Sequence, residues 1–214
     1  MKKYIVIQGP VATRSGYGDH TRDIVHSLIA MDKYYIDIIS LPWGQCPMDA
    51  LNVSNEKDQL IINRLAKGNI TRQPDIFIQV SVPNEFCIDR NNKPMKPGKF
   101  NIGITAGIET NQVPPSFIEG CNRMDLIIAT SEHTKAGLVS TVYDRINNQT
   151  QQKEGDLKCE TPVEVLFEGL DLDIYFKTDE LDESVVNELS SIKEKSCFLF
   201  VGHWIKGGLG QDRK

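Results

Sequence analysis

The stretch YIVIQGPVATRSGYGDHTRDIVHSLIAM, residues 4–31, contains the unit on which we expect the fold to be built. Residues 4–8 form a largely apolar run, which is typical of a parallel strand covered by helices on both faces. A loop with several glycines follows at residues 9–18. Residues 18–31 then place their apolar side chains on one stripe of a helix. The stretch therefore predicts a strand, a loop and a helix in that order.

Similar apolar runs recur along the chain and are rich in Ile, Val and Phe. They lie at residues 34–40, 75–80, 100–105, 125–129, 163–167 and 197–201. Helical patterns separate several of them, at residues 55–67, after Ser131 and at residues 181–192. In the helix after Ser131, the side chains expected to face inward are Leu138, Val139, Val142 and Tyr143. This alternation predicts an α/β fold, with a Rossmann-like, doubly wound and mainly parallel sheet.

Two domains are expected, divided after a hinge-like stretch at residues 168–173. Residues 1–175 form the Rossmann-like domain. Residues 176–214 form a linker helix and the first strand and glycine-rich loop of a second domain, which is incomplete because the chain ends at Lys214. The polar segments 84–99 and 147–160 contain many Asn, Gly or Pro residues and are expected to be surface loops.

Composition restricts the function classes. The net charge is -5 and the pI about 5.4, so we expect no nucleic-acid partner. The apolar run near the N-terminus is too short for a signal peptide, and nothing approaches the ~20 apolar residues of a transmembrane segment. The five cysteines are scattered and form no C-x-x-C pair, which favours reduced thiols over a disulfide framework. We therefore expect a cytoplasmic protein.

The first candidate site is the loop that precedes the first helix, around Gly16, Tyr17 and Gly18. Backbone N–H groups at a helix N-terminus can bind a phosphate group or a sugar hydroxyl. The glycines can equally serve only to form a tight turn. The loop matches neither G-x-G-x-x-G nor the Walker A pattern, which disfavours a nicotinamide-dependent oxidoreductase.

The second candidate site follows the strand at residues 100–105. Glu109 is the only acidic residue in the segment 102–115. Its carboxylate can bind a polar substrate, or it can cap the helix that begins at Pro114 and Pro115. His20 and His133 can line a cleft at the same edge of the sheet, although a structural or solvated histidine is the alternative for each. No pattern typical of a metal site occurs.

Several segments, taken in order, resemble one known family. These are SGYGDHTRDIVHSL (15–28), ITAGIETNQVPPSF (104–117), MDLIIATSEHTKAGL (124–138), PVEVLFEGLDLDIYF (162–176) and FLFVGHWIKGGLGQDRK (198–214). Together they resemble the retaining GT-B glycosyltransferases of group 1, or family four, in which two Rossmann-like domains face each other across a cleft. The resemblance covers essentially the whole chain.

The resemblance implies that the chain is the acceptor-side, N-terminal half of a GT-B enzyme, with the first strand of the donor-binding domain. Gly169, Asp171 and Phe176 match the family's passage between the two domains. Arg213 and Lys214, or alternatively Lys206, match its basic donor-binding pair. The later region in which the family's donor-binding domain carries its E-x7-E motif is absent, and the family's frequent acceptor-loop histidine is not found at residues 106–109.

The function implied is transfer of a sugar from a nucleotide-sugar donor to a sugar or glycan acceptor, without a cofactor or metal. Catalysis would be assigned to Glu109, and the 214-residue chain would have little or no activity alone. The alternative is a noncatalytic domain that binds a glycan or a protein. The strand expected at residues 197–201 would also expose an edge through which two copies could associate.

Overall fold

The computed structural model describes residues 2–68, 70–147, 149–172, 175–178 and 180–198. The chain divides into two compact units, Met1–Gly169 and Leu170–Lys214. Unit 1 contains the sheet and the helices that pack on it, and the described part of unit 2 contains one helix. The two units are described separately below.

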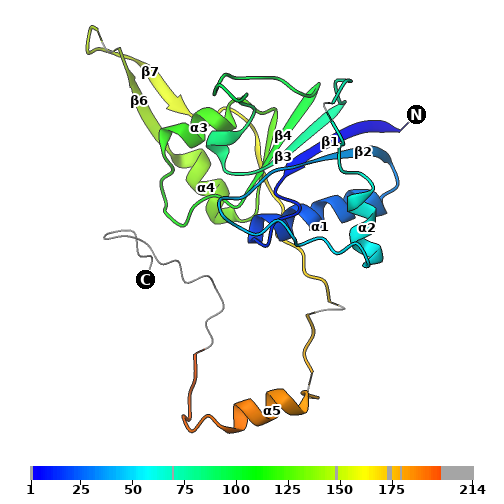
Figure 1. Ribbon diagram of the computed structural model, residues 1–214. Coiled ribbons are helices and arrows are strands. Elements are labelled where there is room, and N and C mark those ends of the chain that lie inside the picture. Colours follow the sequence, from blue (N-terminus) through cyan, green and yellow to red (C-terminus); the bar gives the residue numbers. More distant parts are fainter. Residues whose placement is uncertain (1, 69, 148, 173–174, 179, 199–214) are drawn as a thin grey trace. The chain divides into compact units, whose positions relative to one another are not determined.

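Unit 1 is built on a six-stranded sheet in the order β2-β1-β3-β4-β5-β8, in which every pair of neighbours is parallel (Figure 1). The strands are β1 (Lys3–Gly9), β2 (Tyr34–Ser40), β3 (Ile76–Val80), β4 (Phe100–Thr105), β5 (Leu126–Ala129) and β8 (Val163–Val165). The prediction of a mainly parallel α/β sheet is confirmed. Strand β8 is shorter than expected, because Leu166 and Phe167 lie beyond it with exposed side chains.

Residues 64–66 add a minimal further strand outside β2. Leu65 forms an isolated parallel bridge with Ile38. The Ile38 N–H donates to the carbonyl of Arg64 at 2.8 Å, and the Ala66 N–H donates to the carbonyl of Ile38 at 2.8 Å. The chain thus moves outward from β1 to β2 to residues 64–66 and then returns to β3 on the other side of β1. This is the order of strands in a Rossmann fold, with the reversal at β1 and β3.

Both faces of the sheet are buried. Helices α1 (Gly16–Ala30) and α2 (Glu56–Ile62) lie side by side on one face (Figure 1), where Ile5, Ile7 and Val25 belong to one core cluster. Helices α3 (Pro115–Cys121) and α4 (Glu132–Ser140) contribute to the opposite cluster, with Val6, and so does Phe86, which directly follows the short helix η1 (Pro83–Glu85). Successive residues of β1 therefore enter different clusters, which explains why the strand is an apolar run without polar alternation.

Two helices end earlier than predicted. Helix α2 ends at Ile62, because the next residues turn to make the bridge beside β2. Helix α4 ends at Ser140, so the prediction that Val139, Val142 and Tyr143 face inward from it is wrong: Val139 is exposed, and the other two belong to the next strand. Leu138 is buried as expected.

The segment 147–160, predicted to be a loop, contains a strand. Strands β6 (Val142–Ile146) and β7 (Lys153–Lys158) form an antiparallel hairpin that projects from unit 1 (Figure 1). Lys153 contacts the carboxylates of Asp144 and Asp156 at 2.6 and 2.7 Å. The hairpin was not predicted, because most of its side chains are polar and exposed and no apolar pattern indicates its strands.

The segment 84–99 lacks regular structure apart from the end of η1, as predicted, but it is not only a surface loop. Phe86 and Cys87 are buried in the core. A Cβ atom at Gly103 of β4 would lie 2.6 Å from the Phe86 ring. The close packing of ring on strand anchors this segment to the sheet.

Unit 2 contains helix α5 (Glu183–Ser190), which confirms a helix within residues 181–192. Its apolar side chains Val185, Val186 and Leu189 are exposed, as is that of Leu181, which precedes the helix. Of the strand predicted at residues 197–201, Cys197 and Phe198 belong to no strand, and the rest lies outside the described residues. The predicted association of two copies through this strand is therefore untested.

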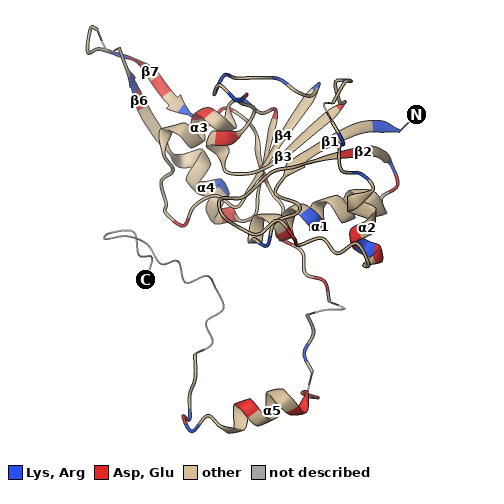
Figure 2. Ribbon diagram, viewed as in Figure 1, with Lys and Arg blue, Asp and Glu red and all other residues tan. Residues whose placement is uncertain are grey.

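Charged residues of both signs are interspersed along the described elements (Figure 2). Among the described residues, no helix is both long enough and apolar enough to cross a membrane.

Candidate functional site

The loop after β1 is held rigidly at the start of helix α1. Ser15 is the N-cap, and its hydroxyl accepts a hydrogen bond from the Gly18 N–H at 3.0 Å. The Thr13 hydroxyl lies 2.8 Å from that of Ser15 and donates to the carbonyl of Pro10 at 2.8 Å. These bonds fix the helix start at the carboxyl edge of the sheet, where ligands bind in open α/β folds.

The residues predicted to bind phosphate have different environments. A Cβ atom on Gly18 would lie 2.3 Å from the carbonyl oxygen of Thr13, so this glycine permits close packing, and its N–H is already used by the cap. Gly16 is exposed, and a Cβ atom there would meet nothing within 4 Å. Within the described chain, the N–H groups of Gly16 and Tyr17 donate to no protein acceptor. These two donors can therefore serve a ligand.

Tyr17 connects the helix start to two other strand ends. Its hydroxyl lies 3.1 Å from the Thr105 hydroxyl and accepts from the Ala106 N–H at 3.1 Å, both at the end of β4. Its ring stacks on Trp43, which follows β2, with ring centroids 4.2 Å apart. Burial raises the pKa of the Tyr17 phenol, which is thus neutral at physiological pH.

His20 is the unusual residue at this edge. Its side chain is only 6% exposed, and neither ring nitrogen has a hydrogen-bond partner among the described residues. The nearest charged group is the carboxylate of Glu168, whose Oε1 lies 3.7 Å from Nδ1. Because a buried polar atom without a partner costs about 1–3 kcal/mol, the ring is expected to bind something that the protein itself does not supply.

His20 lines a pocket of about 300 Å³ at the carboxyl edge, together with Gly16, Tyr17, Trp43, Ala106 and Glu168. This volume lies at the lower end of the range of about 300–1,000 Å³ for small-molecule sites. The pocket offers an aromatic wall, an imidazole and a carboxylate, and no lysine or arginine lines it. Such a lining suits a small neutral molecule with hydroxyl groups better than an anion or a whole nucleotide.

Glu109 and His133 lie elsewhere on the same edge. The backbone carbonyl of Glu109 lies 3.2 Å from His133 Nε2, and both side chains are exposed. Glu109 does not cap helix α3, because Pro114 occupies the N-cap position and no side-chain hydrogen bond is made there. The capping prediction is therefore wrong, and neither residue lines the pocket with His20.

The remaining predicted site residues lie where unit 1 ends, in unit 2 or outside the described residues. Gly169 is exposed at the end of unit 1, directly after Glu168. Asp171 belongs to unit 2, where its backbone carbonyl accepts from the Tyr175 N–H at 2.8 Å. Arg213, Lys214 and Lys206 lie outside the described residues.

Two pocket residues, Trp43 and Glu168, were not predicted. Each follows the carboxyl end of a parallel strand by three residues, β2 for Trp43 and β8 for Glu168. The rule that ligands bind at that edge could have indicated both residues.

A larger cavity of about 680 Å³ lies against the middle of the sheet, where Val6, Ile39 and Phe77 face residues 70–74. It contains none of the predicted site residues. Its lining is mainly apolar, and its one arginine, Arg72, lies over the Tyr4 ring at 5.0 Å. The smaller pocket is the better candidate, because polar groups converge there at the ends of the strands.

The sheet order and the polar pocket at its carboxyl edge define a Rossmann-like α/β domain. Comparison of the chain with protein-family models, with curated proteins and with solved structures gave no match. Among the described residues, no group of three or more potential metal ligands comes together.

Proposed function

We propose that this chain is the acceptor-side domain of a retaining GT-B glycosyltransferase, followed by the beginning of its donor-binding domain. The enzyme transfers a sugar from a nucleotide-sugar donor to a hydroxyl group of an acceptor. The observation that carries this proposal is the buried His20 without a hydrogen-bond partner, which faces a small pocket with an aromatic wall. The order of family-like segments along the chain supports it independently.

In this proposal, the pocket binds the acceptor. His20 accepts a hydrogen bond from the acceptor hydroxyl through one ring nitrogen, and Glu168 orients the ring from the side of Nδ1. Trp43 packs against the C–H face of the sugar. Ala106 lines the same pocket. An imidazole from α1 thus takes the place of the acceptor-loop histidine that this chain lacks at residues 106–109.

The donor phosphates bind at the mouth of the pocket. The N–H groups of Gly16 and Tyr17 stabilise the negative charge that develops on the departing diphosphate, aided by the helix dipole. Arg213 and Lys214 supply further positive charge from the donor-binding domain. Because most donor contacts belong to that domain, we expect the 214-residue chain alone to bind UDP- and GDP-sugars no more tightly than about millimolar.

A titration with free neutral hexoses tests the acceptor pocket. The chain has two tryptophans, so a Trp204→Phe variant leaves Trp43 as the sole indole reporter. We expect its fluorescence to change saturably with glucose, galactose or mannose at about millimolar concentration. In the Trp43→Leu variant the fluorescent reporter itself is removed, so loss of the signal says nothing about binding. Hexose binding by that variant is therefore measured by ligand-observed NMR. If inorganic phosphate binds and no hexose does, the assignment of this pocket to the acceptor is wrong. Micromolar affinity of the chain for a nucleotide sugar would contradict the assignment of donor binding to the other domain.

The stacked pair of Tyr17 and Trp43 also supports a second function, a noncatalytic glycan-binding domain. Both functions predict that the pocket binds a hexose. They differ in what the coding region beyond Lys214 must encode. A glycosyltransferase requires an in-frame continuation beyond Lys214 with an E-x7-E motif. Sequencing the coding region past that codon, followed by a transfer assay on the complete product, separates them.

A further inference from the structure

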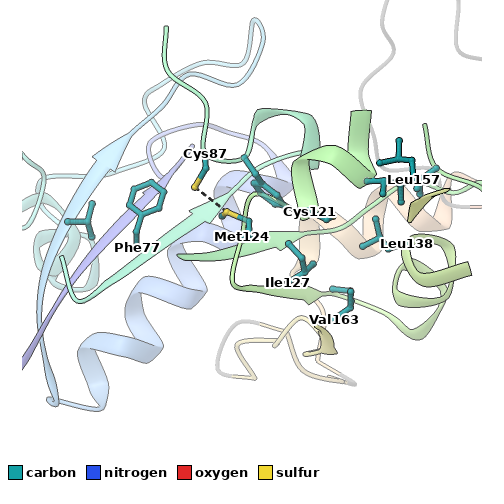
Figure 3. Packing of buried hydrophobic residues seen from close by; sticks show 13 residues of the cluster. Phe77, Cys87, Cys121, Met124, Ile127, Leu138, Leu157 and Val163 are labelled. Carbon is teal, nitrogen blue, oxygen red and sulfur yellow. Dashed lines mark hydrogen bonds between the residues drawn. The ribbon is translucent and has the colours of Figure 1, made fainter. Parts of the chain in front are cut away.

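Three cysteines lie in or against one core cluster of unit 1: Cys87, Cys121 and Cys159. Figure 3 shows two of them, Cys87 and Cys121, near Met124. The Cys87 thiol contacts the Met124 sulfur at 3.2 Å, and burial raises its pKa to about 11. Cys87 is thus an inert core residue. The other two cysteines have a different relationship.

Hydrogen bonds hold the chain around Cys159 against the end of helix α3. The Asn122 side chain donates to the carbonyl of Lys158 at 2.8 Å and accepts from the Glu160 N–H at 2.8 Å. The Thr161 hydroxyl donates to the carbonyl of Cys121 at 2.9 Å. These bonds lie on both sides of Cys159 in the sequence, so they fix this residue beside Cys121.

Cys159 packs against the core cluster that contains Cys121, and the two thiols differ in accessibility. Cys121 is completely buried, whereas Cys159 is partly exposed, and its sulfur also lies 3.5 Å from the carbonyl of Thr161. One thiol of the pair is therefore suited to react first and the other to react second.

We propose that Cys121 and Cys159 form a reversible disulfide when the protein meets a small disulfide oxidant such as glutathione disulfide. The Cys159 thiolate attacks the oxidant, forms a mixed disulfide and releases one glutathione thiolate. The Cys121 sulfur then attacks the Cys159 sulfur, and the departing second glutathione takes up the proton of the Cys121 thiol. The two protein thiols are oxidised by two electrons, and one glutathione disulfide is reduced to two glutathione molecules.

The bond would connect the end of α3 to the segment between β7 and β8. The loop that it closes, residues 121–159, contains β5, α4 and the projecting hairpin. A cross-link across a loop of this length restricts the unfolded chain, so oxidation should stabilise unit 1 reversibly. The proposed disulfide does not depend on the proposed sugar-transfer reaction.

Peptide mapping of the whole chain tests the proposal. After incubation with glutathione disulfide, alkylation and trypsin digestion, we expect the peptides 100–123 and 159–177 to be joined, and dithiothreitol to separate them. Of the five cysteines, the oxidised molecule keeps at most three alkylatable thiols, those of Cys46, Cys87 and Cys197. We also expect the thermal midpoint of unfolding to rise on oxidation and to return on reduction.

Two matched variants complete the experiment. Cys159→Ser should abolish both the joined peptides and the rise in midpoint, whereas Cys87→Ser should retain both. The proposal is overturned if wild-type Cys121 and Cys159 stay alkylatable while the exposed Cys197 reacts with glutathione. A mixed disulfide that persists on Cys159, with Cys121 still free, overturns it equally.

Discussion

Helices α1 and α4 begin in the same way and end up with different environments. Each follows a parallel strand of the sheet, and each has a serine N-cap with almost the same backbone angles: φ -151° and ψ 158° for Ser15, φ -152° and ψ 158° for Ser131. Each serine hydroxyl accepts from the N–H three residues later, at 3.0 Å in α1 and 3.1 Å in α4. The local rule for starting a helix is therefore satisfied twice.

The histidine near each start shows the difference. His20 lies five residues after its cap, on the buried side of α1, and faces a pocket whose walls come from the ends of β2, β4 and β8. His133 lies two residues after its cap, is exposed and contacts only the backbone of the neighbouring loop. Capping positions a helix, but the elements that surround it decide whether its first turns form a site. The predictions below use the two helices as controls for each other.

The largest contrast is expected at the glycines of the two helices. A methyl group on Gly18 would meet the carbonyl oxygen of Thr13 at 2.3 Å, so Gly18→Ala should lower the free energy of unfolding by about 1–3 kcal/mol. At Gly137 of α4 the nearest atoms lie at 3.7 and 3.8 Å, so Gly137→Ala should raise it by up to about 1 kcal/mol. Urea denaturation of both variants measures the two changes. Equal effects of the same sign would contradict the difference in packing.

The two histidines should differ next most strongly, in binding. His20→Gln removes the imidazole from the pocket and leaves the other lining residues in place, so we expect the affinity for the best-binding hexose to fall about tenfold or more, equivalent to about 1.4 kcal/mol. His133→Gln should change that affinity by less than about twofold, because its side chain does not line the pocket. Titrations followed by ligand-observed NMR give both values. A loss at His133 with none at His20 would move the site to the loop that contains Glu109.

Features of the two helices that depend on residues close together in the sequence were predicted, whereas features that depend on residues far apart in the sequence were not. Strands β1 to β5 were placed within a residue or two, because burial on both faces demands apolar runs that the sequence shows directly. The helix that begins after Ser131 was predicted for a similar reason: the interactions that start a helix are local. The hairpin β6–β7 was missed because most of its side chains are polar and exposed, and its isolated buried side chains, such as Leu157, form no apolar run.

The site was predicted only in part for the opposite reason. Tyr17 and His20 were named because they lie near one glycine loop. Trp43 and Glu168 reach the same pocket from segments far away in the sequence, and only the strand order brings them together. Burial of His20 without a partner is also a tertiary property, which no local pattern reports.

The two N-caps should contribute similarly to stability and differently to binding. Ser15→Ala and Ser131→Ala should each lower the free energy of unfolding by about 1 kcal/mol, while the corresponding glycine variants should lose only a few tenths. Because Ser15 also contacts Thr13 in the loop that fixes the first turn of α1, only its replacement should weaken hexose binding as well. Denaturation and titration of the four variants separate these effects. A purely local role for Ser15 would leave hexose affinity unchanged in both of its variants.

The smallest effects are expected at the acidic residue in the first turn of each helix, Asp19 in α1 and Glu132 in α4. Asp19 is exposed and pairs with Arg22, but Arg22 also donates to the carbonyls of Val11 and Thr13 at 2.7 and 3.0 Å and so stays anchored without it. Asp19→Asn and Glu132→Gln should therefore each lower the free energy of unfolding by no more than about 0.5 kcal/mol, through the helix dipole. High salt should reduce both losses, since exposed charges are screened. A much larger, salt-resistant loss for Asp19→Asn would mean that its contact with Arg22 is what holds the loop at the start of α1, and the two helix starts would then differ in electrostatics as well as in their surroundings.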